Sequence, residues 1–144
     1  MMYTLKIADG DLAVRGDGDV TKVEGRDMIE QNVACWLMEP VGSDPMYPKF
    51  GSRLWGMIGT PIVDDTEGTV KSEVRRVASA YKTYQDYLRD QYSRSAVADS
   101  GAWRAQDVVK SVGIPRVSAV ADTVRVVVNL RTEAGDDVTV DQTV

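Results

Sequence analysis

The sequence of 144 residues contains no histidine. This absence excludes nucleophiles activated by histidine within the chain, zinc sites with imidazole ligands, and a pH switch based on imidazole. There is one cysteine, Cys35, so neither an internal disulfide nor a cluster of thiolate ligands can form. We expect Cys35 to be a small packed residue rather than a reactive thiol, because no neighbour in the sequence offers a base.

An excess of positive charge and long apolar runs are also missing. Lys and Arg number 17 and Asp and Glu number 22, which gives a net charge of −5. Such a chain has no general attraction to nucleic acid or to anionic lipid, so we expect neither as a partner. No apolar run approaches the roughly 20 residues that cross a bilayer, and the N-terminus lacks the apolar core of a signal peptide. We therefore expect a soluble protein of a reducing cytoplasm, without a cofactor.

The length and the hydrophobic content of the chain suit one domain, residues 1–144. Hydrophobic residues make up 43% of the chain, and the length is that of an ordinary single domain. Alternating apolar and polar residues predict strands at both ends, and helical spacing predicts helices between them. The sequence therefore predicts an α+β fold, with an N-terminal β-meander, amphipathic helices and a C-terminal β-hairpin in one small sheet.

The N-terminal third is predicted to contain the meander, a helix and a loop. Residues 3–25 alternate between Asp-Gly turns, so the meander should face a core on one side. A helix should begin near Asp27, which has Glu30 at capping-box spacing, and should stop at Pro40. Residues 40–50 contain three prolines and should form an irregular loop. The helix has an apolar stripe made of Ile29, Val33, Trp36 and Leu37.

Two further helices are predicted in the middle of the chain. Ser52 should cap a short one, and Asp64 with Glu67 should cap a long one. The short helix has a packing face of Leu54, Trp55, Met57 and Ile58, and the long one has apolar steps of three and four at Val70, Val74, Val77, Tyr81, Tyr84 and Leu88. Two interpretations of Tyr81, Tyr84 and Tyr87 stay open: a core helix with amphipathic edges, or packing on a neighbouring protein.

The last third is predicted to be mostly β-structure. Residues 93–102 read as an exposed linker and residues 103–112 as a short helix. Strands are predicted over 117–122, 124–130 and 138–144, with a hairpin loop at 133–137.

No catalytic or metal-binding pattern rises above background. The acidic pairs at 64–65 and 136–137 are expected at a helix start and in a turn, where negative charge has a structural role. The Gly-rich segments have no following lysine of the phosphate-binding type. Asp17-Gly18-Asp19 resembles the start of a calcium loop, but Met28 stands where the twelfth-position Glu would be. Arg75 and Arg76 are expected on the solvent face of the long helix, and salt bridges to a partner are the alternative.

The order of these segments resembles a known family. Gly-Asp-Val-Thr-Lys-Val-Glu-Gly at 18–25 precedes a helix with Gln31, Pro-Lys-Phe-Gly-Ser-Arg-Leu stands at 48–54, and Pro115-Arg116-Val117 precedes the last strands. The chain is similar to the baseplate wedge and sheath-initiator family of contractile phage tails and related injection systems, over residues 18–92 and 113–140. The family usually has Glu-Pro-Arg before those strands, whereas this chain has Ile114 before Pro115. Relative to the family, the linker and short helix at 93–112 look like an insertion.

The resemblance implies a structural role without catalysis. Members of the family sit in the baseplate of the virion tail, around the tail tube and among other wedge proteins, in several copies in a symmetric ring. They give the first ring of tail sheath protein something to join. Some relatives have a lysozyme label, so the alternative is a peptidoglycan-degrading enzyme, which would need two carboxylates at a set distance in a cleft.

We expect the partner-binding residues to lie in three places. A last strand with a free edge could pair with sheath strands, and deletion of its seven residues should leave a folded monomer that cannot start a sheath. The structural alternative is that the hairpin only completes the core sheet. Arg116 should bind acidic groups of neighbouring wedge proteins, although an internal pair with Glu39 or Asp44 is an equal alternative. The predicted set is Pro115, Arg116, Val138, Val140, Gln142, Val144, Phe50 and Arg53.

Overall fold

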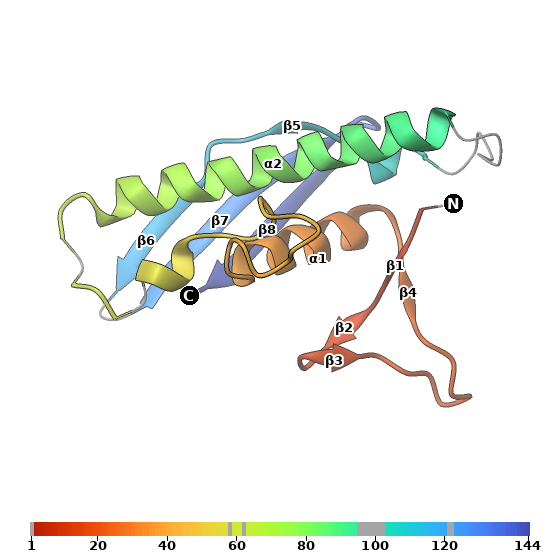
Figure 1. The fold of residues 1–144 in the computed structure, drawn as a ribbon, viewed down its shortest axis with the longest axis horizontal. Coiled ribbons are helices and arrows are strands. Elements are labelled where there is room, and N and C mark those ends of the chain that lie inside the picture. The colour runs from red at the N-terminus through yellow and green to blue at the C-terminus, as the bar shows by residue number, and fades with distance from the viewer. Residues whose placement is uncertain (1, 58, 62, 95–102, 121–122) are drawn as a thin grey trace.

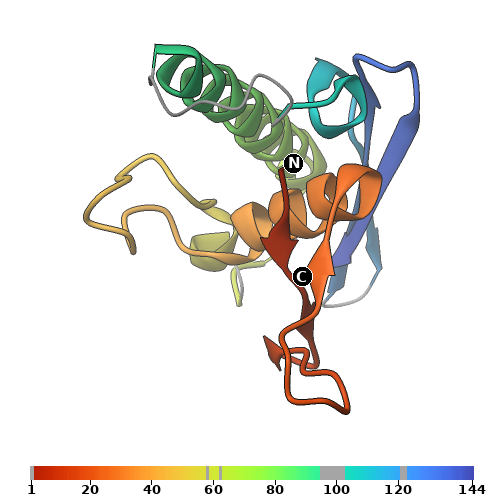
Figure 2. The same ribbon diagram turned by 90° about the vertical axis from the view of Figure 1, so that its right-hand side faces the viewer.

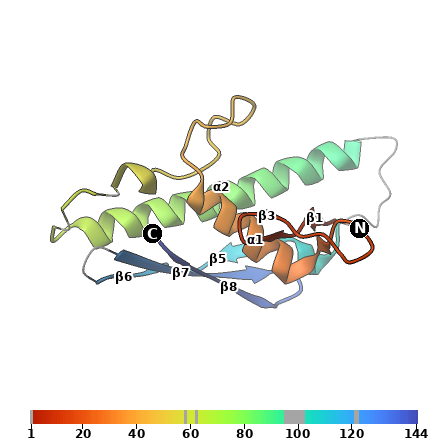
Figure 3. The same cartoon turned by 90° about the horizontal axis from the view of Figure 1, so that it is seen from below.

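The computed structural model describes residues 2–57, 59–61, 63–94, 103–120 and 123–144. Two helices cover one face of a four-stranded antiparallel sheet, and a ribbon of short strands extends away from this body (Figures 1 and 3). The fold is α+β, as predicted. In chain order the elements are β1 (Thr4–Leu5), β2 (Ile7–Ala8), β3 (Asp11–Leu12), β4 (Lys22–Val23), α1 (Gly25–Met38), the 3₁₀ turn η1 (Leu54–Met57), α2 (Thr66–Arg94), the 3₁₀ turn η2 (Ala105–Asp107), β5 (Val109–Val112), β6 (Arg116–Val120), β7 (Thr123–Thr132) and β8 (Asp137–Thr143).

The main sheet is built around β7, the longest strand. β8 pairs with one side of β7, from Arg125 opposite Thr143 to Arg131 opposite Asp137. β6 pairs with the first half of the other side of β7, and β5 pairs with the second half. β5 and β6 therefore follow one another along one margin of the sheet, and β8 forms the opposite margin.

The core lies between the sheet and the two helices. Alternate residues of β7 and β8 face the helices, and the residues between them are exposed or half-buried on the other face. This is the alternation expected of an antiparallel sheet with one solvated face. The core includes Ile29, Val33, Leu37, Val70, Val74, Val77, Val126, Val128, Leu130, Val138 and Val140.

The N-terminal meander is not part of this core. β1 pairs with β4 and β2 pairs with β3, and neither pair joins the main sheet. Residues 2–24, called the arm below, extend away from the body (Figure 2). The prediction that the meander faces a core was wrong, because the apolar residues of its strands stay exposed: Leu5, Ile7, Leu12 and Val14.

Neither long helix begins where it was predicted: α1 begins earlier and α2 begins later. α1 begins at Gly25, and its N-terminal amide is capped by a distant side chain: the Gly25 N–H donates to Asp107 Oδ1 at 3.0 Å. Asp27 is therefore not the cap. α2 begins at Thr66, two residues after the predicted cap Asp64, and the Thr66 hydroxyl accepts the Val63 N–H. Local capping patterns located these helices to within two residues, but they named the wrong caps.

The predicted helix over 103–112 was also wrong. Only Ala105–Asp107 form a 3₁₀ turn, and Val109–Val112 form a strand of the main sheet. The second half of β7 offers its backbone there, and the buried Gln85 side chain accepts the Val109 N–H at 2.9 Å. The segment is thus an integral part of the sheet. Of the linker predicted at 93–102, Ser93 and Arg94 belong to α2, whereas the remainder lies outside the described residues, as does Ile58.

Candidate functional site

The two margins of the main sheet differ in whether their outer backbone groups have hydrogen-bond partners. On the β5–β6 margin, side chains of α2 accept two of the backbone amides, since Gln85 accepts from Val109 and Glu67 accepts from Ala119. On the β8 margin, no described residue bonds to the outer backbone groups. β8 is therefore the margin whose outer backbone groups lack hydrogen-bond partners among the described residues, although native proteins usually cover such edges.

The register identifies the residues that present this edge. The amide and carbonyl of Val144 both bond to Val124, at 2.9 Å each. Pairs of this bonded type recur at every second residue in an antiparallel ladder, so Val138, Val140 and Gln142 also point their backbone groups toward β7. The residues between them point their backbone groups outward: Asp137, Thr139, Asp141 and Thr143.

This geometry corrects the predicted residue set. Val138 and Val140 are 1% and 0% exposed, and both their side chains and their backbone groups are used inside the chain. Gln142 and Val144 are half-buried, and Val144 packs against the core. The predicted strand is therefore an edge strand, but the groups that it offers belong to its other residues. The sequence alone gave the alternation of this strand and could not say which set faces outward along the edge.

The exposed side chains of β8 bond across to β7. Both Asp141 carboxylate oxygens accept hydrogen bonds from the Arg125 guanidinium, at 2.9 and 2.5 Å. The hydrogen bond and charge of Arg125 lower the pKa of Asp141. Thr139 Oγ1 donates to Asn129 Oδ1 at 3.0 Å. These contacts hold the strand against β7 from its solvent face and leave the outer edge free.

The second predicted segment, residues 48–54, is fixed to α2 by two charged side chains. Glu73 Oε1 accepts the Arg53 N–H at 2.8 Å, and Arg76 donates both to Glu73 and to the Gly51 carbonyl. Burial raises the pKa of Glu73, but hydrogen bonds and charges from Arg76 and Arg53 outweigh it, so the pKa of Glu73 is lowered. Arg76 was predicted to lie on the solvent face of the helix. It is instead half-buried, in an internal ion pair with Glu73.

The backbone conformation of this segment requires glycine at position 51. Gly51 has φ of +95°, and a Cβ there would lie 2.6 Å from the Glu39 carbonyl oxygen. The Ser52 N–H donates to that carbonyl, and the Ser52 hydroxyl donates to the Leu37 carbonyl at 2.6 Å. Phe50 packs edge-on against Trp36, with ring centroids 5.0 Å apart. The Phe50 side chain thus packs against the core, whereas Pro48, Lys49 and Arg53 are the exposed residues of this segment.

Pro115 immediately precedes β6 and Arg116 is the first residue of β6, but the two side chains have different surroundings. Pro115 is buried, whereas Arg116 is exposed on the face of the sheet that the helices leave open. Within the described part of the chain Arg116 forms no ion pair, so the predicted alternative with Glu39 or Asp44 is not formed. Pro115 is therefore packed inside the fold, whereas the Arg116 guanidinium is exposed and has no ionic partner within the described residues.

Sequence reasoning missed a buried polar cluster that joins four elements: α1, α2, η2 and β5. Asp107 is 0% exposed and accepts hydrogen bonds from the Gly25 amide and from Arg104. Gln85 bonds to the Asp107 carbonyl, the Val109 amide and the Tyr81 hydroxyl. Only a polar residue in the apolar stripe of the long helix, Gln85, could have signalled this cluster. Its partners Asp107 and Val109 lie 22 and 24 residues away along the chain, so spacing does not reveal them.

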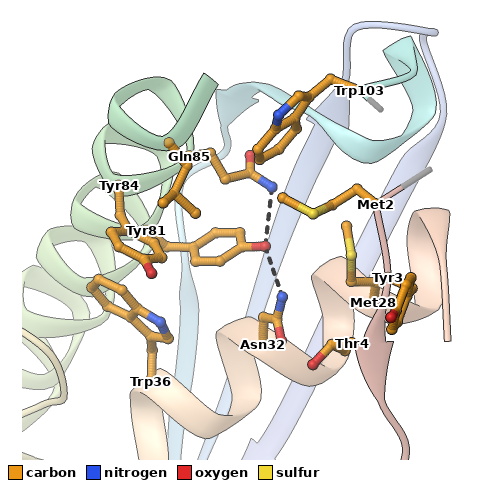
Figure 4. A pocket seen from close by; sticks show the side chains of 11 residues that line it. Met2, Tyr3, Thr4, Met28, Asn32, Trp36, Tyr81, Tyr84, Gln85 and Trp103 are labelled. Atoms are coloured by element: carbon orange, nitrogen blue, oxygen red, sulfur yellow. Dashed lines mark hydrogen bonds between the residues drawn. The ribbon is translucent and has the colours of Figure 1, made fainter. Parts of the chain in front are cut away.

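A cavity of about 290 Å³ lies next to this cluster, between the two helices and the start of the arm (Figure 4). Its wall is mostly aromatic and apolar, and the described residues that line it include no Asp or Glu, so nothing there favours the glycosidase alternative. Tyr81 is buried, and burial raises the pKa of its hydroxyl to about 12. Tyr84 is half-buried and Tyr87 is exposed, so the tyrosines divide between the core and the surface. The lining residues are Met2, Tyr3, Thr4, Met28, Asn32, Trp36, Tyr81, Tyr84, Gln85, Leu88 and Trp103.

The remaining candidates for chemistry give no site. The described residues contain no group of three or more Cys, Asp or Glu side chains placed to hold a metal ion. Burial, and then the charge of Glu39, raise the pKa of Cys35, which disfavours its thiolate. Among the helices of the described chain, none is long and apolar enough to cross a membrane.

Comparison with known proteins adds no relative. No protein-family model matches the chain, and no curated protein matches it either. The family suggested by the order of the segments therefore stays a prediction.

Proposed function

We propose that this protein is a structural component of a contractile-tail baseplate wedge, and that it nucleates the sheath by offering the β8 edge to strands of the first sheath ring. The single observation that supports the proposal is the contrast between the margins of the sheet. Side chains of α2 cover amides of the β5–β6 margin, and no described residue bonds to the outer groups of β8. An edge that is left open in a chain that covers the other edge is suited to β-strand addition.

The strength of such pairing suits assembly in a ring. The outward groups of Asp137, Thr139, Asp141 and Thr143 can form about four to six backbone hydrogen bonds, each contributing roughly 0.5–1.5 kcal/mol net. One copy would therefore hold a sheath strand by only a few kcal/mol. In a symmetric ring around the tail tube, later contacts become intramolecular and the same weak bonds act together.

The other exposed groups would hold neighbouring wedge proteins. Arg116 presents a planar guanidinium that has no ionic partner within the described chain, and carboxylates are its natural ligands. Arg53 stands exposed beside a loop that Glu73 and Gly51 hold in one conformation. In this proposal the protein works in the baseplate of a virion tail and needs no cofactor and no catalytic residue.

A proline at the edge tests the proposal directly. The Thr139 N–H points outward, so Thr139→Pro removes a donor and places a ring in the path of an added strand, without breaking the β7–β8 ladder. Thr139→Ala is the matched control, because it removes the same side-chain bond to Asn129 and keeps the amide. We expect particles with Thr139→Pro to lack sheaths in electron micrographs, and particles with Thr139→Ala to have them.

A second edge variant separates assembly from folding. Thr143→Pro changes another outward amide near the chain end, where backbone strain is more easily relieved. Circular dichroism of both purified variants should match the unsubstituted chain. Normal sheaths on particles that contain folded Thr139→Pro and Thr143→Pro chains would refute the role of this edge.

A further inference from the structure

The arm has an apolar face that nothing in the described chain covers. Ile7 lies directly opposite Leu12, and the Ala13 N–H donates to the Lys6 carbonyl, so the pairing continues toward the body. Leu5 and Val14 lie two residues along the chain from Ile7 and Leu12, where the pairing changes: Leu5 lies opposite Lys22, and Val14 forms a bridge with Val20. These four side chains, called the arm face, are 39–61% exposed. Two-stranded ribbons are marginally stable alone, so an apolar face of this kind is suited to a partner.

The arm is also acidic around this face. Residues 2–24 contain five acidic residues, four of them aspartates, against three basic residues, Lys6, Arg15 and Lys22. Three of these carboxylates accept backbone amides within the arm, which fixes their positions in the turns. The aspartates are Asp9, Asp11, Asp17 and Asp19. A surface that receives the arm should therefore be apolar and basic.

One described surface of the same chain has that composition. Ile114 and Val120 are 71% and 69% exposed, and Arg116 stands between them on the open face of β6. Lys110 is exposed on the adjoining strand β5. These four residues, called the β5–β6 stripe, combine exposed apolar side chains with two cations, neither of which forms an ion pair within the described part of the chain.

A contact between these two surfaces has to join different molecules. In Figure 1 the arm extends from the lower side of the body, whereas β5 runs along the upper side beyond α2. The arm is joined through residue 24 to the N-terminus of α1. It is held near this helix because the Gln31 side chain bonds to the Leu5 carbonyl and to the Ile7 amide. The arm of one molecule therefore cannot reach its own stripe.

We propose that the arm face of one copy docks on the β5–β6 stripe of a second copy. The contact is head-to-tail, since each copy uses its arm on one neighbour and its stripe on the other. Such contacts generate closed rings or open chains of copies, depending on the rotation between neighbours. An arm-to-arm contact would bring together two acidic surfaces, and a contact with the β8 edge would bring the aspartates near Asp137 and Asp141. The proposal is independent of the role of β8 in sheath assembly, and it names a second copy of this chain as the neighbour that Arg116 binds.

Sedimentation velocity of the purified chain tests this contact with two blocked variants. Ile7→Ser/Leu12→Ser removes the apolar centre of the arm face, and Arg116→Glu reverses the charge of the stripe. We expect the unsubstituted chain to associate at concentrations up to about 100 µM, and each variant alone to associate about tenfold more weakly or not at all. Met46→Asp is the matched control, because Met46 is 82% exposed but lies in the loop at 40–50; it should associate like the unsubstituted chain.

Mixing the two variants decides the geometry. The arm variant keeps an intact stripe and the stripe variant keeps an intact arm, so an equimolar mixture should form a one-to-one dimer that does not grow further. Raised salt should weaken that dimer, because the aspartates and cations are exposed. The proposal is overturned if the unsubstituted chain is monomeric throughout. It is also overturned if the stripe variant associates normally while the arm variant does not, which is the result expected of an arm-to-arm contact or of a different partner protein. Circular dichroism of each variant confirms that a loss of association is not a loss of folding.

Discussion

Single side chains decide where the loop at 48–54 lies on the body. Glu73 is buried, and its carboxylate is satisfied by the Arg76 guanidinium and by the Arg53 amide. Its pKa is lowered because these bonds and charges outweigh burial. A carboxyl group whose pKa is lower in the folded state stabilises the fold at pH values above its unfolded pKa, and this contribution is lost as the pH falls through the folded value.

Glu73→Gln should reveal this contribution as a pH dependence. At pH 7 we expect the variant to be less stable by roughly 1–3 kcal/mol, because a charged acceptor is replaced by a neutral one. The difference from the unsubstituted chain should shrink as the pH is lowered below the ordinary value of 4.5 for this group. Urea unfolding of both chains at neutral and acidic pH measures it. Asp86→Asn is the control, since Asp86 pairs with Lys82 at the surface and should change stability little. A constant difference across the pH range would contradict the assigned role of Glu73.

Among the secondary elements, the arm depends on a side chain for its attachment. The Gln31 amide accepts from the Ile7 N–H at 2.9 Å and donates to the Leu5 carbonyl at 2.8 Å. These are the bonds that a neighbouring strand would make, so α1 binds the arm through one residue in place of a strand. Lys22 lies 4.4 Å from the centre of the Tyr3 ring and adds a second contact within the arm.

Gln31→Ala should loosen the arm and leave the body intact. Loss of about 1–2 kcal/mol of local bonding should speed hydrogen exchange of the Ile7 amide roughly fivefold to thirtyfold. The exchange of core amides in β7 should not change, because the arm does not pair with the main sheet. Hydrogen exchange followed by mass spectrometry measures both, and Glu30→Ala, at an adjacent exposed position, is the control. Equal exchange of Ile7 in both variants would show that Gln31 does not hold the arm.

At the scale of the whole molecule, the stability of the core depends on the last strand, β8, and does not depend on the arm. Val138 and Val140 of β8 are buried against the helices, and β8 pairs with β7 along its length. Removing the last seven residues would expose the core, so the expectation of a folded truncated monomer does not agree with the packing. The arm, by contrast, is joined to the body mainly by Gln31, by the Glu24–Arg104 ion pair and by the edge of the cavity.

Two truncations should therefore behave in opposite ways. Deletion of residues 137–144 should abolish cooperative unfolding, because it removes core valines that each contribute roughly 1.5–3 kcal/mol. Deletion of residues 2–23 should leave a cooperative transition, lowered by only a few degrees. Thermal unfolding followed by circular dichroism distinguishes them. A cooperative transition in the first variant would mean that the sheet does not need β8, and an unfolded second variant would mean that the arm is part of the core.

The predictable part of this protein is the part that depends on near neighbours in the sequence. Period-two alternation determined the strands over 116–120, 123–132 and 137–143, and steps of three and four determined the apolar faces of α1 and α2. The irregular loop at 40–50 was also predictable, because three prolines and a glycine mark an irregular backbone. Each of these signals lies within a few residues of the structure that it specifies.

Tertiary structure alone decided how those pieces are used. Asp107 caps α1 from 82 residues away, Gln85 draws residues 109–112 into the sheet, and Glu67 and Gln85 cover one margin while β8 stays open. The alternation of β8 fixed which side chains enter the core, but the direction of its backbone groups depends on the register with β7. Register and long-range hydrogen bonds are properties of two segments at once, so no single stretch of sequence contains them.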